Sequence, residues 1–228
     1  MSAARERRRS GVQTRELVLD SAEHLFAAKG YRATSLEEIG REAGLSRATP
    51  GYFFRSKDGL YGEMLARIFA RAQVALAPAY ERFRPDEPID EALDDLVRAH
   101  LELLAREPAL VRLIQWETLN DDARIVLELG SRARPLVTLI QELSEHIGPL
   151  RLDSARATAL LIGIASLCWF PLAYADALEQ AVGTDSRSRD AIDSQTQKIV
   201  EFVLSQVREQ PVPDDDRDAR NGTFAPPG

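Results

Sequence analysis

Apolar residues recur along most of the chain at intervals of three and four positions, which places them on one face of an α-helix. In the first such segment Val18, Ala22, Leu25 and Phe26 follow this spacing, and Gly30 then supplies a residue that ends a helix readily. No segment alternates apolar and polar residues convincingly, as a half-buried strand does. The pattern therefore predicts an all-α fold.

Glycine, proline and capping residues divide this pattern into separate segments. The predicted helices cover residues 14–31, 35–43, 47–54, 57–83, 89–106, 109–119, 123–147, 153–182 and 190–208. Pro78 predicts a bend in the fourth segment, and Pro135 predicts a bend or break in the seventh. The residues from Glu209 onward are rich in Pro, Asp and Gly, so we expect a disordered tail.

The second and third segments are the most informative part of the chain, because they predict two short helices around a tight turn. Two overlapping capping-box patterns, Thr34 with Glu37 and Ser35 with Glu38, predict the start of the first short helix. Gly44 supplies the left-handed residue that ends it. This arrangement is typical of a helix-turn-helix.

Ser46 is the predicted N-cap of the second short helix, over residues 47–54. Arg47 and Thr49 lie at its start, where a recognition helix presents its groups to the major groove of DNA. Arginine is the commonest reader of guanine edges in that groove. The segment therefore predicts double-stranded DNA as the partner.

The string A-x-x-L-F-x-x-x-G-Y-x-x-T-S-L-x-x-I-x-x-x-A-G-L-S, followed by Y-F-F-x-S-K, resembles the N-terminal domain of the TetR family (TetR/AcrR-like) of bacterial transcriptional regulators. The resemblance covers about residues 13–65. It implies an N-terminal three-helix helix-turn-helix DNA-binding domain and a larger C-terminal helical ligand-binding and dimerisation domain. We expect a flexible basic arm over residues 1–12, the DNA-binding domain over 13–60, the effector-binding and dimerisation domain over 61–208, and the tail over 209–228.

Carried over position by position, the resemblance implies base-edge contact from Arg47 and phosphate contacts from Thr34, Ser35, Thr49, Tyr52 and Lys57. Phosphate contacts position a protein on DNA, and base contacts give it sequence specificity. Helix capping alone also explains Thr34 and Ser35, and an ordinary solvated helix start is the less favoured alternative for Lys57.

The sequence departs from the commoner family pattern at Pro50-Gly51, where many members have an aliphatic residue and then a tyrosine that contacts phosphate. Pro50 removes a helical hydrogen bond if it lies past the first turn, and Gly51 weakens a helix by about 1 kcal/mol relative to alanine. Alternatively, Gly51 allows the backbone to approach DNA closely while Tyr52 supplies the aromatic hydroxyl.

Charge is distributed unevenly between the two ends of the chain. Residues 1–60 hold eleven Lys and Arg against eight Asp and Glu, a net of +3, whereas the whole chain carries −7, which leaves −10 for residues 61–228. A basic DNA-binding domain (the reading head) on an otherwise acidic protein directs the correct end toward DNA. The arginine-rich run at residues 5–9 is either a DNA-contacting arm or a solvated tail. With no apolar region behind it, this run is no export signal, so we expect a cytoplasmic bacterial protein that is nucleoid-associated when bound.

Two apolar features of the second half have alternative interpretations. The uncharged run over residues 157–175 has the length of a membrane span, but it contains Thr158, Ser166 and Pro171, so we expect a buried helix and no membrane partner. Cys168, the single cysteine, lies in this run and predicts packing rather than redox sensing.

The resemblance implies that the last two helices form a four-helix homodimer interface with the same two helices of the partner subunit. The expected interface residues are Ile192, Ile199, Val200, Val203 and Val207. The candidates for lining an effector pocket among the middle helices are Phe69, His100, Trp116, Trp169, Phe170 and Tyr174. For each of these, simple core packing explains the residue at least as well. An apolar or aromatic, largely uncharged small molecule is the expected effector.

No enzyme constellation, metal site or cofactor motif is recognisable, because the three histidines fall on separate helices without nearby ligand patterns. We expect a dimeric repressor that binds a palindromic operator and is released by its effector. An activator of the same fold or a regulator without an effector stays open, as does, more remotely, a helical-bundle enzyme or a membrane-associated protein.

Overall fold

The computed structural model describes residues 2–82, 89–119, 125 and 154–208. Helices make up nearly all of these residues, and no strand occurs among them, which confirms the all-α prediction. The predicted helix over residues 123–147, including the bend at Pro135, lies outside the described residues except for Ile125. The expected tail over 209–228 also lies outside them.

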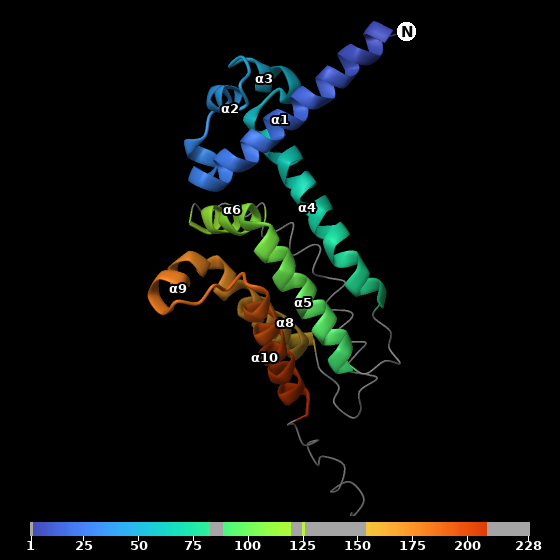
Figure 1. The fold of residues 1–228 in the computed structure, drawn as a ribbon, viewed down its shortest axis with the longest axis vertical. Coiled ribbons are helices and arrows are strands. Elements are labelled where there is room, and N and C mark those ends of the chain that lie inside the picture. The colour runs from blue at the N-terminus through green and yellow to red at the C-terminus, as the bar shows by residue number, and fades with distance from the viewer. Residues whose placement is uncertain (1, 83–88, 120–124, 126–153, 209–228) are drawn as a thin grey trace, which may run out of the picture.

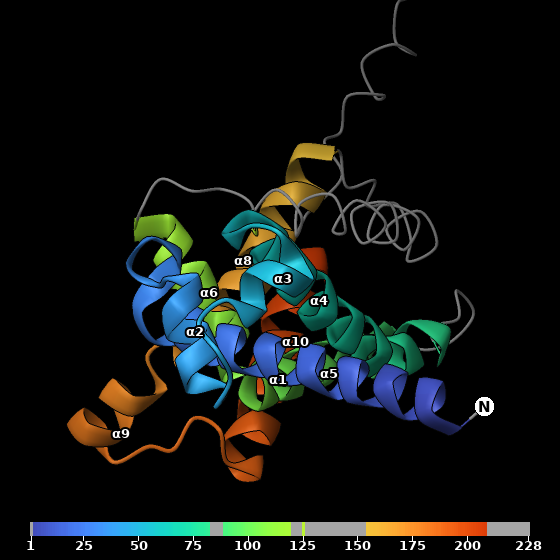
Figure 2. The ribbon, with the colours of Figure 1, turned by 90° about the horizontal axis from the view of Figure 1, so that it is seen from above.

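The helices pack into a small N-terminal group and a larger body (Figure 1). Their bounds are α1 Ser2–Ala33, α2 Leu36–Glu42, α3 Thr49–Phe54, α4 Lys57–Arg82, α5 Ile89–Arg106, α6 Pro108–Leu119, α8 Ser154–Ala173, α9 Ala175–Val182 and α10 Arg189–Arg208. Helix α4 runs from the N-terminal group along α5, while α9 projects from the side of the body in both views (Figure 1, Figure 2). Helix α6 begins at Pro108, one residue before the predicted segment 109–119, and α4 continues as one helix past Pro78.

Helix α1 begins earlier than expected. The backbone is helical from Ser2, so residues 2–12 form the N-terminal turns of α1. The composition accounts for this, because alanine, arginine and glutamate are strong helix formers. The predicted end at Gly30 is a kink with φ 81° and ψ 167°, after which the chain makes one more turn to Ala33.

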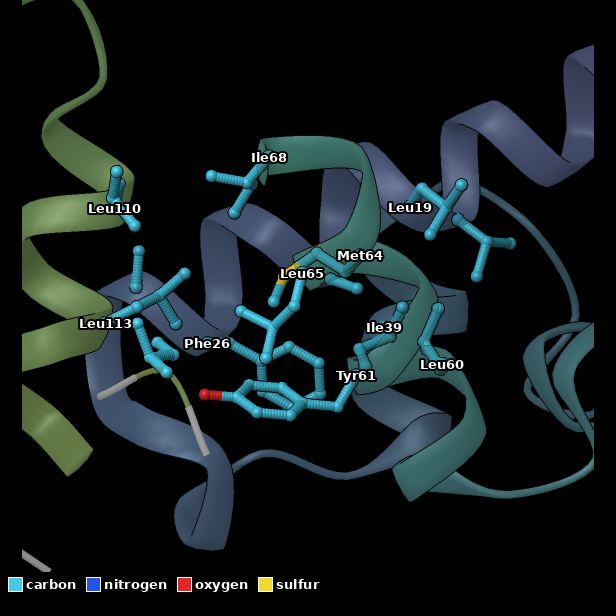
Figure 3. Close-up of a cluster of buried hydrophobic side chains, with 14 of the residues drawn as sticks. Leu19, Phe26, Ile39, Leu60, Tyr61, Met64, Leu65, Ile68, Leu110 and Leu113 are labelled. Atoms are coloured by element: carbon cyan, nitrogen blue, oxygen red, sulfur yellow. The ribbon is translucent and has the colours of Figure 1, made fainter. Parts of the chain in front are cut away.

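The larger of the two apolar cores among the described residues joins the N-terminal group to the body. Phe26 of α1 meets the Tyr61 ring of α4 edge to face at 5.1 Å between ring centroids. Leu110 and Leu113 of α6 close the same cluster from the other side (Figure 3). The expected domain boundary at residues 60–61 therefore falls inside a continuous core.

A second core lies between α5, α8 and α10. It contains Leu93, Val97, Leu101, Cys168, Leu172, Ile192, Ile199, Val200 and Val203. Burial raises the pKa of the Cys168 thiol to about 12, so the reactive thiolate is disfavoured. This agrees with the expected packing role of the cysteine.

The predicted helix over residues 153–182 is divided at Tyr174 into α8 and α9, which meet at 65°. Pro171 lacks an N–H group, so it cannot donate to the Leu167 carbonyl, which accepts from Gln195 Nε2 at 3.1 Å. The Ala173 carbonyl at the end of α8 accepts from Gln115 Nε2 at 3.0 Å. Within the described residues no single helix has the length and apolarity to cross a membrane, and only this bent pair passes that test on length and composition.

Candidate nucleic-acid interface

The first short helix, α2, begins as the Ser35 capping box predicts. Ser35 Oγ accepts from the Glu38 N–H at 3.2 Å, and Glu38 Oε2 accepts from the Ser35 N–H at 3.4 Å. Thr34 does not cap: it is 2% exposed, and its hydroxyl donates to the Gly30 carbonyl at 2.9 Å. Of the two overlapping patterns, only that of Ser35 forms. The Thr34 hydroxyl faces the protein interior and is not accessible to a phosphate in this conformation.

The turn between α2 and α3 depends on two glycines. Gly44 has the left-handed φ of 69° that the sequence predicted. A Cβ on Gly40 would lie 2.7 Å from the Ser46 carbonyl oxygen, so α2 passes the turn closely enough that no larger residue fits without movement. The turn thereby holds α3 against α2.

Helix α3 begins at Thr49, two residues later than predicted, and Ser46 is not its N-cap. The N-cap is Ala48, which makes no side-chain capping bond, while Ser46 Oγ and Thr49 Oγ1 bond to each other at 2.8 Å. This start places Pro50 in the first turn, where N–H groups lack an intrahelical partner anyway. Pro50 therefore removes no hydrogen bond from α3, and its side chain is buried.

Two side chains of this segment extend into solvent. The Tyr52 residue is 83% exposed. The Arg47 side chain is 72% exposed, and its guanidinium lies 3.7 Å from the Glu37 carboxylate. An ion pair this exposed contributes little stability and exchanges readily for another partner. Phe54 is buried in the core, so α3 is fixed on one side and presents Tyr52 on the other.

Lys57 at the start of α4 is half-buried and makes internal contacts. Its Nζ donates to the carbonyls of Tyr31 and Thr34, both at 2.9 Å, and lies 4.2 Å from the Tyr31 ring centroid. An ammonium has three N–H groups, so these two bonds leave one for a phosphate. The lysine ties the end of α1 to α4, a role that sequence reasoning missed.

Two further exposed residues beside α3 were not predicted. Arg55, the C-cap of α3, has a φ of 63°, which directs the chain out of the helix. Ser56 Oγ accepts from the Gly59 N–H at 3.0 Å and so caps the start of α4. The sequence signal for Ser56 was a serine immediately before the predicted helix start at residue 57, the N-cap position.

Trp116, an effector candidate, lies at the junction between α6 and the N-terminal group. Its Nε1 donates to the Ala27 carbonyl of α1 at 3.1 Å. The adjacent Glu117 is 3% exposed, and its carboxylate accepts from Tyr61 Oη at 2.8 Å and from the Ile125 N–H at 2.5 Å. Neighbouring residues of α6 therefore fix both α1 and α4.

An ionic cluster strengthens the same junction. Arg71 of α4 donates to both carboxylate oxygens of Glu107, at 2.9 and 2.7 Å, and to both of Glu23 on α1, at 3.2 and 2.7 Å. The hydrogen bonds to Glu107 and Glu23 raise the pKa of Arg71 despite its partial burial. A groove between α4 and α5 begins at this residue and is lined by none of the six effector candidates.

The other effector candidates are spread over separate regions. Phe69 is buried in the core that contains Phe26. His100 Nδ1 lies 2.8 Å from the Leu96 carbonyl, and burial lowers the pKa of its imidazole. Trp169 is half-buried, whereas Phe170 and Tyr174 are 57% and 51% exposed with ring centroids 5.0 Å apart.

The residues expected at the dimer interface are occupied within the chain. Ile192, Ile199, Val200 and Val203 are at most 8% exposed and pack against α5 and α8. Their periodicity reflects the chain's own core and not a free face, and the side chain of Val207 lies outside the described residues. Apolar side chains are exposed instead at Ile162 and Phe170 of α8, at Tyr174, the N-cap of α9, and at Phe202 of α10.

Comparisons with known sequences agree with this architecture. Residues 18–64 match the family described as bacterial regulatory proteins of the tetR family, and residues 90–203 match the tetracyclin repressor-like C-terminal domain. The chain is 30% identical over 132 residues to the HTH-type transcriptional regulator RutR of Escherichia coli K12, covering 58% of the chain and 60% of RutR. It is 26% identical over 195 residues to the HTH-type transcriptional repressor NicS of Pseudomonas putida, covering 81% of the chain and 90% of NicS.

Solved structures show the same fold at low sequence identity. A TetR-like transcriptional regulator from Rhodococcus sp. RHA1 superposes with a TM-score of 0.64 at 17% identity, covering 86% of this chain and 97% of that one. The regulator FadR from Bacillus subtilis, solved in complex with stearoyl-CoA, has a TM-score of 0.60 at 15% identity, with 83% and 97% covered. The chain thus belongs to the TetR family of bacterial transcriptional regulators.

Proposed function

We propose that the chain is a dimeric repressor of the bacterial cytoplasm that binds a palindromic operator through α2, α3 and the start of α4, without catalysing a reaction. The observation that carries this proposal is the exposure of Arg47 and Tyr52 on a segment whose opposite side is fixed in the core. A segment that is held by core packing on one side keeps its exposed side chains in place for base and phosphate contact.

The proposed contacts are more limited than the sequence predicted. Arg47 reads a base edge, and Tyr52, Thr49 and Ser35 contact phosphates. Lys57 contributes at most its one remaining N–H, and the buried Thr34 hydroxyl is left out. Arg55 is added as an exposed cation beside Tyr52.

We expect Arg47→Ala to weaken binding to a duplex recovered from a random pool by about 10- to 100-fold, because a good arginine–guanine pair contributes about 1–3 kcal/mol. Fluorescence anisotropy at fixed salt measures the dissociation constant. Arg106→Ala is the matched control, since this α5 side chain is also largely exposed and bears the same charge. Equal affinities for both variants and the unmodified protein contradict the proposed role of Arg47.

The repressor and effector parts of the proposal are supported by similarity. NicS, a relative over most of its length, is named a repressor, and FadR of Bacillus subtilis, which shares the fold, was solved with stearoyl-CoA. We infer a small, largely apolar effector that binds in the body and shifts the chain to a state with a different spacing of reading heads. The shift is limited by the difference in effector affinity between the two states.

Trp116 provides the readout for an effector. Because the Trp116 indole is hydrogen-bonded to Ala27 of α1, a shift of α6 relative to the N-terminal group changes the surroundings of the indole. Tryptophan fluorescence measured across a panel of apolar compounds, with operator release assayed in parallel, tests this part of the proposal. Compounds that release DNA without altering the emission of Trp116 or Trp169 count against it.

A further inference from the structure

Gly51 is a glycine that the folded chain does not itself require. It lies in the middle of α3, and a Cβ built on it has no heavy atom within 4 Å beyond its immediate neighbours. Gly40 and Gly59 differ, since a Cβ there would lie 2.7 and 2.6 Å from the carbonyl oxygens of Ser46 and Phe54. Glycine is also a weaker helix former than alanine. Position 51 therefore weakens a short helix without relieving an internal clash.

The surroundings of Gly51 place it on the proposed DNA-binding segment. The next residue is Tyr52, which is 83% exposed, and Arg47, in the turn before α3, has 72% of its side chain exposed. Pro50, on the other side, is buried. Between these exposed side chains, Gly51 presents bare backbone to open space, and bare backbone permits an unusually close approach of a ligand.

We propose that Gly51 is a close-approach position of the operator interface, where the sugar-phosphate backbone of DNA packs directly against the backbone of α3. This inference rests on the proposed DNA-binding function. The absence of a side chain at residue 51 sets the depth at which α3 enters the major groove, and Tyr52 reaches the phosphate beside it. A methyl group at position 51 would hold α3 away from the DNA.

The test is that stability and affinity change in opposite directions. Gly51→Ala is expected to raise the urea midpoint of unfolding, because alanine favours the helix and meets no neighbour. The same variant is expected to bind the selected duplex at least 10-fold more weakly, and Gly51→Leu more weakly still. Circular dichroism confirms that each variant keeps its helical content.

Gly62→Ala is the matched control, since Gly62 lies in α4, is exposed and likewise has no heavy atom within 4 Å of a built Cβ. It is expected to raise the urea midpoint and leave the dissociation constant unchanged. If Gly51→Ala binds as tightly as the unmodified protein while Arg47→Ala does not, the inference is overturned and the DNA-binding function stands. If the unmodified protein binds no duplex in preference to random DNA, the function fails, and this inference fails with it.

Discussion

Glutamate in place of Ile162 or Phe170 is expected to convert the protein from a dimer into a monomer and to weaken operator binding by about 100-fold or more. Both side chains lie on α8 and are exposed, at 61% and 57%. They belong to the uncharged run of residues 157–175, and Phe202 of α10 extends the apolar surface beside Gly163. An exposed apolar surface of this kind is typical of an interface.

The size of the effect follows from symmetry. In a two-fold interface each substitution occurs twice, so two carboxylates lose their hydration without gaining a cation. An uncompensated buried charge costs about 3–5 kcal/mol, which is enough to dissociate a dimer at micromolar concentration. Each monomer then engages only one half-site, and the avidity of two linked reading heads is lost.

Light scattering after size-exclusion chromatography measures the mass, which is expected to fall from twice 25.4 kDa to 25.4 kDa. Val74→Glu is the matched control, because Val74 is a 75% exposed apolar residue on α4, away from this surface. It is expected to leave the dimer intact. A dimer that persists in both α8 variants contradicts the proposed interface.

Gly30→Ala is expected to lower the free energy of unfolding by about 2–4 kcal/mol through two separate effects. The first is backbone strain, since φ 81° with ψ 167° is a conformation that is essentially restricted to glycine and costs other residues about 1–3 kcal/mol. The second is a clash, because the new Cβ would lie 3.0 Å from Cδ2 of Trp116. Overpacking of this kind typically costs about 1–3 kcal/mol.

Urea unfolding at fixed protomer concentration measures this change, since the stability of a dimer depends on concentration. Gly62→Ala, on an open helical site, is expected to be neutral or stabilising by up to about 1 kcal/mol. Adding Trp116→Ala to Gly30→Ala removes the clash and leaves the strain, so the two changes are expected to be non-additive. A Gly30→Ala variant as stable as the unmodified protein rules out the described packing of α6 on α1.

Local signals predicted the parts of the fold that local chemistry determines. The bounds of α5, the start of α6, the Ser35 cap and the left-handed Gly44 all follow from residues within one turn of each feature. The start of α3 was misplaced because Ser46 is a good cap but Pro50 fits best in the first turn. The sequence did not show which of these two preferences prevails.

The interface and effector predictions depended on contacts that periodicity does not specify. The stripe through Ile192 and Ile199 shows that one face of α10 is buried, but the same stripe suits an internal core and a partner subunit equally. Trp116 was grouped with other aromatics by residue type. In the structure its indole is hydrogen-bonded to Ala27 of α1, which lies 89 residues earlier in the chain. Such long-range contacts are set by the packing of whole helices.

Selection of bound duplexes from a random pool by the 228-residue protein tests whether it is a dimer that reads DNA sequence. We expect an enriched inverted repeat with half-sites about one helical turn, or a multiple of it, apart, since two-fold symmetry places the two reading heads on successive major-groove faces. Arg47→Ala, selected in parallel, is expected to lose the preference at one position of each half-site. Recovery of no sequence preference, or of a motif without a repeat, would contradict a dimeric regulator that reads DNA through Arg47 and α3.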